Sequence, residues 1–303
     1  MSTIRLSYIL TTRNKLPYLK VTLPRLLANV QPDEEVMVAD AASTDGSKEY
    51  LADLYQQGKI HYFISEPDFG ESHGDNKLFL TAHGELLKII TDDDVFFYPG
   101  IRKCKAFMLA HQEIDLLGTD GGFKNQYPED RVRPLQHAKD YEAWQTSRRP
   151  FCSCGLGTMF RKSSLPLIGL WNPSFRRADA EFLYRVTSGK AIVAWYTNPC
   201  FVNISNPQSI SVVYMKKIHR ETQKLEQFYL DKKPDPAIVV KAKIAMRLLR
   251  RFLTSRQRHN KTGNAATSSP EQWHQTWQVM EKACCQWLEQ ESKEKKGGFL
   301  SKT

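Results

Sequence analysis

Short apolar segments typical of strands alternate with longer amphipathic segments typical of helices over the first 120 residues of the chain. Strands are recognised by alternating or continuous apolar residues, and helices by apolar residues spaced three and four apart. The expected strands span residues 4–12, 34–40, 60–66 and 86–91, and the expected helices span residues 16–30, 47–58 and 75–85. Strands separated by helices of this length pair in parallel through right-handed crossovers. The sequence therefore predicts an α/β fold with a mostly parallel sheet flanked by helices.

The pattern becomes less regular in the second part of the body. Residues 121–155 are rich in Gly, Arg and Pro, which predicts a loop region over the edge of the sheet. Regular patterns resume with a strand and a short helix over residues 155–171, a helix over residues 178–190 and a strand over residues 191–196.

The positive charge of the chain is concentrated at its C-terminal end. Of the 43 Lys and Arg and 33 Asp and Glu, residues 211–303 contain 19 and 9, which leaves 24 of each sign for residues 1–210. Helical patterns also dominate this end. We therefore expect a body of residues 1–215 and a basic, helical C-terminal extension of residues 216–303, whose charge indicates a partner of the extension.

One segment of the extension has the composition of a helix that lies on a membrane surface. Residues 237–253 combine a broad apolar face with a basic face that carries Lys243, Arg247, Arg250 and Arg251. Such a helix binds anionic lipid through both faces. A helix that packs on the body and leaves its basic face in solvent is the alternative.

The last helix carries a stripe of large apolar side chains. We expect it to begin with Ser269 as its N-cap and Pro270 in its first turn. The stripe consists of Trp273, Trp277, Met280, Cys284 and Trp287, spaced three and four residues apart. We interpret it as a surface that packs against the body or another subunit, so Trp273, Trp277 and Trp287 are candidates for a homo-oligomer contact. A platform for sugar rings is the alternative.

Composition excludes several classes of protein. No apolar run approaches the ~18 residues of a membrane-spanning helix, and the N-terminal segment lacks the layout of a signal peptide. The six cysteines do not have the spacing of common zinc sites. We expect reduced thiols in a cytoplasmic protein.

Three consecutive aspartates, Asp92, Asp93 and Asp94, follow the apolar strand at residues 86–91 and precede four large apolar residues, 95–98. Carboxylates crowded against apolar side chains are costly unless they are paired or bind a cation. In open α/β sheets, ligands lie at the carboxyl ends of the strands. Oxygen ligands there suit Mg²⁺ or Mn²⁺, ions that commonly carry substrate phosphates. The triplet therefore indicates a metal site for a phosphate-bearing ligand, with a solvated acidic loop as the alternative.

Other polar residues end neighbouring strands at the same edge. Asp40 closes the strand at residues 34–40, and a Thr-Thr-Arg-Asn segment, residues 11–14, follows the first strand. Arg13 and nearby backbone N–H groups are donors for an anionic ligand, whereas Asp40 has the alternative role of capping the turn that follows it. The chain contains neither a Walker A loop nor a G-x-G-x-x-G motif. The metal would therefore neutralise the phosphates.

Five segments, considered together, resemble family 2 glycosyltransferases in their order and spacing. They are residues 6–27, 36–51, 65–85, 89–100 and 155–186. The resemblance extends over residues 4–211, and the five segments together are highly specific. It implies the GT-A fold, a Rossmann-like α/β architecture here followed by an α-helical extension, and an inverting transfer from a nucleotide-sugar.

The resemblance also implies roles for individual residues. Contacts to the nucleotide-sugar are expected from Thr11, Thr12, Arg13, Asn14, Asp40, Asp68, Asn76, Lys77, Asp92 and Asp93. Asp94, with Asp92 beside it, is similar to the carboxylate of the family's D-x-D region that coordinates the metal. Asp179 matches the catalytic base. Positions at the acceptor side or in support are expected for Gly157, Thr158, Glu181 and Arg185.

These roles imply a metal-dependent enzyme with Mn²⁺ or Mg²⁺ as its cofactor. The donor would be a UDP-sugar, with GDP- and dTDP-sugars as alternatives, and the acceptor a glycan or lipid-linked hydroxyl in cell-surface polysaccharide synthesis. The enzyme would act in the cytoplasm, with residues 237–253 at the inner face of the membrane. A catalytically inactive nucleotide-sugar binder is one alternative. A nucleic-acid-binding protein that uses the basic extension is the other, although the acidic rim of a neutral body would repel a polyanion.

Overall fold

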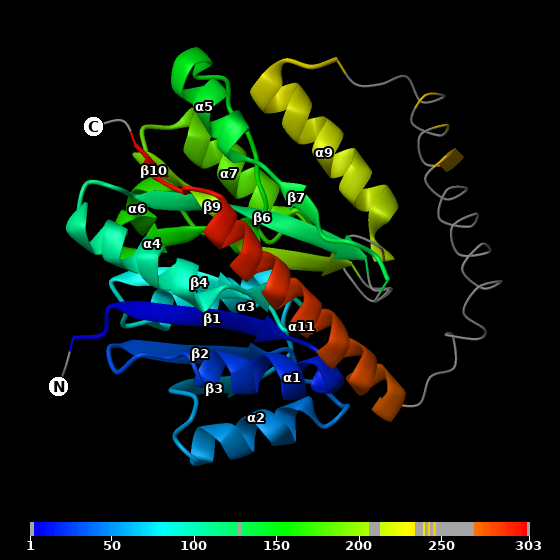
Figure 1. Cartoon of the computed structure of the whole chain (residues 1–303). Coiled ribbons are helices and arrows are strands. Elements are labelled where there is room, and N and C mark those ends of the chain that lie inside the picture. Colours follow the sequence, from blue (N-terminus) through cyan, green and yellow to red (C-terminus); the bar gives the residue numbers. More distant parts are fainter. Residues whose placement is uncertain are drawn as a thin grey trace.

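The computed structural model describes residues 3–125, 129–205, 213–233 and 270–301, together with residues 239, 242, 245 and 246. One sheet runs through the molecule, and helices cover both of its faces (Figure 1). The α/β fold predicted from the sequence is confirmed.

The N-terminal half of the sheet is parallel. Its strands are β1 (Leu6–Thr12), β2 (Glu34–Asp40), β3 (Tyr62–Ser65) and β4 (Leu86–Ile90), in the spatial order β4-β1-β2-β3. The connecting helices are α1 (Leu16–Leu27), α2 (Ser47–Gln56) and α3 (Glu71–Thr81). The predicted alternation is confirmed, but α3 ends before Gly84, because the Gly84 N–H donates instead to Ser7 Oγ of β1 (2.9 Å).

The C-terminal half of the sheet is mixed. Its strands are β6 (Leu116–Asn125), β8 (Met159–Arg161), β9 (Val193–Ser205) and β10 (Phe299–Leu300), with the short strands β5 (Val95–Phe96) and β7 (Arg133–Leu135). β8 is antiparallel to both β4 and β6, and β6 is parallel to β9. The helices are α4 (Tyr98–Ala110), α5 (Ala138–Ser147), α6 (Leu165–Ile168) and α7 (Ala178–Ser188), with 3₁₀ turns η1 (Gly155–Gly157) and η2 (Lys162–Ser164).

The prediction of a loop over residues 121–155 is wrong in part, because β6 continues into this segment and β7 and α5 follow. Two glycines of β6 lie against aromatic rings of β9. A Cβ at Gly118 would overlap the ring of Trp195, and a Cβ at Gly121 would overlap the ring of Phe201. Close packing against these rings therefore requires glycine in a strand.

Two hydrophobic clusters fill the spaces on either side of the sheet. In β1, Tyr8 and Leu10 belong to the cluster with α1, α2 and α4, and Ile9 belongs to the cluster with α3, α5 and α7. Successive side chains of a strand point to opposite faces. Because both faces are covered, nearly all side chains of β1, β2 and β4 are buried, and most of them are apolar.

The C-terminal extension packs on the body. α9 (Met215–Leu230) lies against α7, and α11 (Pro270–Glu294) crosses α1 and β9 (Figure 1). The side chains of α11 that are fully buried against the body are Trp277, Met280, Cys284 and Leu288. The ring of Trp277 meets that of Tyr18 edge to face, with centroids 4.9 Å apart. Packing on the body is confirmed for Trp277, Met280, Cys284 and Trp287 of the stripe.

Other predictions for the extension are only partly covered by the structure. α11 begins at Pro270 as expected, whereas Ser269 and the side chain of Trp273 lie outside the described residues. Residues 237–253 also lie outside them, apart from residues 239, 242, 245 and 246. None of the helices in the described part of the chain is both long and apolar enough to cross a bilayer.

Candidate active site

A cavity of about 780 Å³ opens at the carboxyl ends of β1 and β4. Its walls come from the ends of β1 and β9, the segment after β4, the η1 turn, the starts of α3 and α7, and the N-terminal part of α9. The predicted site residues that line it are Thr11, Thr12, Arg13, Asp68, Asp92, Asp93, Asp94 and Asp179. The fold thus brings the polar residues at the ends of β1 and β4 together with Asp179.

The end of β1 is tied to the aspartate triplet. Thr12 Oγ1 donates a hydrogen bond to Asp92 Oδ2 (2.6 Å), and the Lys15 ammonium forms an ion pair with Asp93 Oδ2 (2.6 Å). Both members of the ion pair are mostly buried. The first loop of the chain therefore fixes two of the three aspartates.

Asp94 is held from the opposite side, by the end of β9. Its Oδ1 accepts hydrogen bonds from the Ile204 N–H (2.6 Å) and from the Asn203 side-chain amide (3.1 Å). Its Oδ2 accepts a hydrogen bond from Thr91 Oγ1 (2.6 Å). These three donors orient the carboxylate at the floor of the cavity.

Burial and mutual repulsion disfavour the charged form of the acidic groups around the cavity. Burial raises the pKa of Asp92 to about 7 and that of Asp94 to about 8, and the charge of Asp93 adds to both shifts. Burial also raises the pKa of Asp75 to about 7 and holds the pKa of Glu71 well above its usual range. A cation among these groups would favour their ionised forms.

The acidic groups fit a divalent cation that is held partly by its substrate. Among the described residues, no three His, Cys, Asp or Glu side chains converge into a metal site that is complete by itself. Mg²⁺ is commonly bound by one or two carboxylates plus substrate phosphates, and Mn²⁺ prefers the same oxygen ligands. Asp94 and Asp92 would be those carboxylates, because both line the cavity and a carboxylate oxygen has two lone pairs.

Asp40 and Asn14 shape a loop beside the cavity without lining it. The Asp40 carboxylate accepts hydrogen bonds from the N–H and hydroxyl of Ser43 and from the hydroxyl of Ser65 (2.7 Å). Asn14 Oδ1 accepts a hydrogen bond from the Thr44 N–H (2.8 Å). Both residues were predicted to contact the nucleotide, and in the structure both hold the turn after β2. For Asp40 this agrees with the alternative role, in which it caps the turn that follows it.

Asp179 occupies the first turn of α7, with its carboxylate in the cavity wall. Its Oδ2 accepts a hydrogen bond from the Gly155 N–H (3.3 Å), and its Oδ1 accepts one from the Ala180 N–H (2.8 Å). A Cβ on Gly155 would lie 2.8 Å from Asp179 Cβ and 3.4 Å from the ring of Trp171. The glycine therefore allows the η1 turn to approach the carboxylate.

Lys88 of β4 supports the η1 turn from beneath. Its ammonium donates hydrogen bonds to the carbonyl oxygens of Leu156 and Thr158, and Thr158 Oγ1 donates to the Gly155 carbonyl (2.6 Å). Burial lowers the pKa of Lys88 to about 8. Gly157 and Thr158, expected at the acceptor side, thus lie behind the wall that Gly155 and Leu156 present to the cavity.

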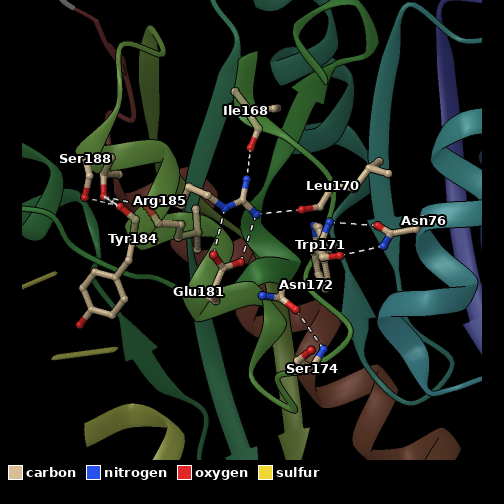
Figure 2. A network of polar contacts seen from close by, with 12 residues as sticks. Asn76, Ile168, Leu170, Trp171, Asn172, Ser174, Glu181, Tyr184, Arg185 and Ser188 are labelled. Carbon is tan, nitrogen blue, oxygen red and sulfur yellow. Dashed lines mark hydrogen bonds and ion pairs between the residues drawn. The ribbon is translucent and has the colours of Figure 1, made fainter. Parts of the chain in front are cut away.

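Asn76 also supports the wall from behind. Figure 2 shows its side-chain amide exchanging two hydrogen bonds with the backbone N–H and carbonyl of Trp171 (3.0 and 2.8 Å), and Trp171 lines the cavity. Lys77, predicted beside Asn76 as a nucleotide contact, instead pairs with Glu66 away from the cavity. Asn76 therefore links α3 to the segment that precedes α7.

Glu181 and Arg185 hold the same segment from α7. Arg185 forms a two-bond ion pair with Glu181 (2.9 and 3.1 Å), as Figure 2 shows. Its guanidinium also donates to the carbonyl oxygens of Ile168 and Leu170, the latter at 2.8 Å. The two residues expected in support thus stabilise the backbone next to Trp171.

Several cavity residues were not among those predicted. They include Lys15, Glu71, Ser72, His137, Arg176, Arg177, Asn203, Tyr214, Met215 and Ile218. Arg176 and Arg177 stand just before Asp179, so the motif that identified the base also contained them. Tyr214, the N-cap of α9, and Ile218 within α9 lie where no local sequence pattern indicates a cavity wall.

Comparisons with known proteins agree with this geometry. The family model described as glycosyl transferase family 2 matches residues 7–165. The uncharacterized glycosyltransferase alr2836 of Nostoc sp. is 30% identical over 118 residues, which are 38% of this chain and 35% of that protein. The match therefore spans about a third of the relative's length.

Two solved structures share the fold. Residues 1–349 of TarS from S. aureus, in complex with UDP-GlcNAc, align with a TM-score of 0.58 and 15% identity over 94% of this chain and 83% of that one. The mannosyltransferase PcManGT from Pyrobaculum calidifontis, in complex with GDP-Man and Mn²⁺, aligns with a TM-score of 0.56 and 14% identity, over 93% and 87%. At such identities the likeness concerns the fold, whereas the family model matches more than half of the chain. This chain belongs to glycosyl transferase family 2 and has the GT-A fold.

Proposed function

We propose that this chain is an inverting glycosyltransferase that moves a sugar from a nucleotide-sugar to a hydroxyl group of an acceptor. The observation that carries the proposal is the meeting of Asp179 with the aspartate triplet in one cavity. The triplet would face the diphosphate of the donor, and Asp179 the attacking hydroxyl. Attack from the side opposite the leaving group inverts the anomeric carbon.

Different residues around the cavity would have different roles in this reaction. Asp94 and Asp92 would hold a divalent cation, which when bound supplies positive charge for the leaving diphosphate. Asp179 would take the proton of the attacking hydroxyl. The N–H groups of Gly155 and Ala180 orient its carboxylate for that step before the acceptor arrives.

The donor is proposed to be a UDP-sugar, with Mn²⁺ or Mg²⁺ as the cation. TarS is in complex with UDP-GlcNAc, and PcManGT is in complex with GDP-Man and Mn²⁺, which supports a nucleotide-sugar donor. Thr11, Thr12, Arg13 and Asp68 would contact this donor, because they line the cavity near the triplet.

The acceptor is proposed to be a hydroxyl of a glycan or of a lipid-linked molecule in cell-surface polysaccharide synthesis. In this proposal residues 1–215 form the catalytic unit, and residues 216–303 form the basic extension. The reaction would take place in the cytoplasm, and residues 237–253 would contact anionic lipid at the inner face of the membrane, where each basic residue adds about 1 kcal/mol.

A screen of nucleotide-sugars with the purified protein tests the proposal. We expect one nucleotide-sugar to raise the melting temperature only in the presence of Mn²⁺ or Mg²⁺, since a ligand at 100 times its Kd adds about 2.7 kcal/mol. The same compound should be hydrolysed or its sugar transferred. Cation-dependent binding without turnover would indicate an inactive binder, and neither binding nor turnover would contradict the proposal.

A further inference from the structure

Two arginines stand directly before the proposed base. Arg176 and Arg177 both line the cavity and are partly buried. Among the residues that the structure describes, neither guanidinium lies within ion-pair distance of a carboxylate, whereas Lys15, another cation of the cavity, is paired with Asp93. Burial lowers the pKa of Arg177, but nearby groups, chiefly the charge of Asp179, outweigh that effect and raise the pKa above its usual range. An anionic ligand bonded directly to the two guanidinium groups would stabilise their charges further.

Helix α9 holds both arginines. Glu221 Oε2 accepts hydrogen bonds from the backbone N–H groups of Arg176 (2.8 Å) and Arg177 (3.1 Å). Thr222 Oγ1 accepts a hydrogen bond from the Arg177 guanidinium (3.1 Å), and the ring of Tyr214 lies 4.7 Å from the Arg176 guanidinium carbon. The extension therefore fixes the backbone and both side chains, which reduces the entropy lost when a ligand binds.

The Arg176 side chain also reaches the donor side of the cavity. A Cβ on Gly70 would lie 2.8 Å from Arg176 Nη1, so the guanidinium passes directly beside the Gly70 backbone. Gly70 lines the cavity and precedes the 11-residue helix α3. Arg176 thus extends from Tyr214, the residue directly before α9, to the loop that precedes α3.

We propose that Arg176 and Arg177 form a phosphate-binding subsite that α9 pre-organises. The planar guanidinium presents N–H groups in a fork that matches the oxygens of a phosphate. This subsite rests on the proposed function, because it takes its phosphate from one of the two substrates in the same cavity. The phosphate belongs either to the diphosphate of the donor or to a phosphate group on the acceptor.

Isothermal titration of two sets of probes separates these sources. The first set is UDP and GDP with Mn²⁺, compared with uridine and guanosine, which carry no phosphate. The second set is glycerol 1-phosphate, compared with glycerol, titrated into protein saturated with UDP and Mn²⁺. The proteins are the wild type, Arg176→Gln and Arg177→Gln, with folding checked by circular dichroism.

A subsite for the donor predicts that both variants bind the nucleoside diphosphate at least tenfold more weakly, with nucleoside affinity unchanged. A subsite for the acceptor predicts unchanged nucleotide affinity and at least tenfold weaker binding of glycerol 1-phosphate. Wild-type affinity of both variants for every phosphate probe would overturn the subsite. If the wild type binds no nucleotide, the proposed function is contradicted. Titration of glycerol 1-phosphate into the nucleotide-free wild type and variants would still test whether Arg176 and Arg177 bind phosphate.

Three further variants of this region serve as controls. Arg220→Gln removes an exposed cation from α9 that does not line the cavity, and should leave all affinities unchanged. Arg177→Lys keeps the charge without the fork and should restore part of the lost affinity. Thr222→Val removes the hydroxyl that orients the Arg177 guanidinium and should weaken the same phosphate probe by a smaller factor than Arg177→Gln. An equal effect of Arg220→Gln would attribute the loss to net charge and overturn the subsite.

Discussion

The acidic residues near this cavity differ in their hydrogen-bond partners, and these partners separate their roles. Asp40 accepts hydrogen bonds from Ser43 and Ser65 and lies off the cavity. Asp179 is held by two backbone N–H groups and lines the cavity. Asp40 therefore organises a turn, whereas Asp179 presents its carboxylate to the cavity.

Asp94 is the residue at which dependence on a divalent cation should be lost. Asp94→Asn keeps an oxygen that accepts the hydrogen bond from the Ile204 N–H, so the fold should be preserved. Because the variant lacks the negative charge, we expect at least tenfold weaker UDP binding in the presence of Mn²⁺ by titration calorimetry. With EDTA present, both proteins should bind UDP equally. Unchanged Mn²⁺ dependence would remove Asp94 from the metal site.

Gly155 is the position at which one methyl group should disturb the base. The Cβ introduced by Gly155→Ala would lie 2.8 Å from Asp179 Cβ, so the carboxylate or the η1 turn must shift. Small displacements of a catalytic group cost on the order of a hundredfold in rate. We expect at least tenfold lower turnover with UDP affinity within twofold.

Gly189→Ala is the matched control for this change, because a Cβ there would lie no closer than 3.4 Å to its neighbours. Turnover and stability of the control should remain near native. If Gly155→Ala also retains native turnover, the η1 turn does not position Asp179.

Lys88 joins β4 to the η1 turn, and its titration should be measurable as a pH dependence of the free energy of unfolding. Burial lowers its pKa from 10.5 to about 8. Between these pH values the unfolded chain binds a proton that the folded chain lacks. The Lys88 contribution to the free energy of unfolding should therefore rise with pH, by up to about 1.4 kcal/mol per pH unit. Below pH 8 both states are protonated and the slope disappears.

Lys88→Met should abolish this rise. Chemical denaturation of both proteins between about pH 7 and about pH 10 gives the difference between their unfolding free energies. We expect the difference to be constant below pH 8 and to grow in favour of the wild type above it. A difference that is the same at every pH would show that the ammonium is not buried as described.

Local sequence patterns predicted the elements whose formation depends on local residues. β1 to β4 were predictable because each has a run of apolar residues and the intervening helices have apolar faces. β6 was not predicted as a strand. Its Gly118 and Gly121 are required by close packing against Trp195 and Phe201, which lie more than seventy residues away in the sequence. Turn chemistry and close ring packing both require glycine, and the sequence does not distinguish them.

The candidate site was likewise predictable where its residues belong to local motifs, and not where distant contacts place them. Thr12, the triplet and Asp179 stand at the ends of elements, in motifs that the family resemblance contains. Tyr214 and Ile218 were not predictable, because α9 is held at the cavity by contacts such as the hydrogen bonds that the Glu221 carboxylate accepts from backbone N–H groups. Because nearly every residue has a backbone N–H group, the sequence does not indicate which of these groups Glu221 contacts.

For the whole molecule, the packing of α11 makes the end of the chain part of the folded body. Trp277 is 1% exposed and contacts Tyr18 of α1. Trp277→Ala should therefore lower the free energy of unfolding by about 3–5 kcal/mol in chemical denaturation. Val279→Ala, on the same helix but 57% exposed, should change it by less than about 0.5 kcal/mol. Equal stabilities of the two variants would contradict this packing.

In the proposed function, Asp179 acts as the base for an acceptor hydroxyl that attacks a donor held by the aspartate triplet in the same cavity. Asp179 lies in the first turn of α7, where Asn keeps an oxygen that accepts one of the two backbone hydrogen bonds but does not accept the proton. Loss of a base costs about 10²–10⁴ in rate, whereas loss of a cap costs about 0.5–2 kcal/mol of stability. These effects are separable in one variant.

The most direct measurement is the turnover of Asp179→Asn with the nucleotide-sugar identified by the screen, made beside melting and UDP titration of the same sample. We predict near-native melting, retained Mn²⁺-dependent UDP binding and turnover reduced at least a hundredfold. Turnover close to the native rate in a variant that still binds UDP would contradict the assignment of Asp179 as the base.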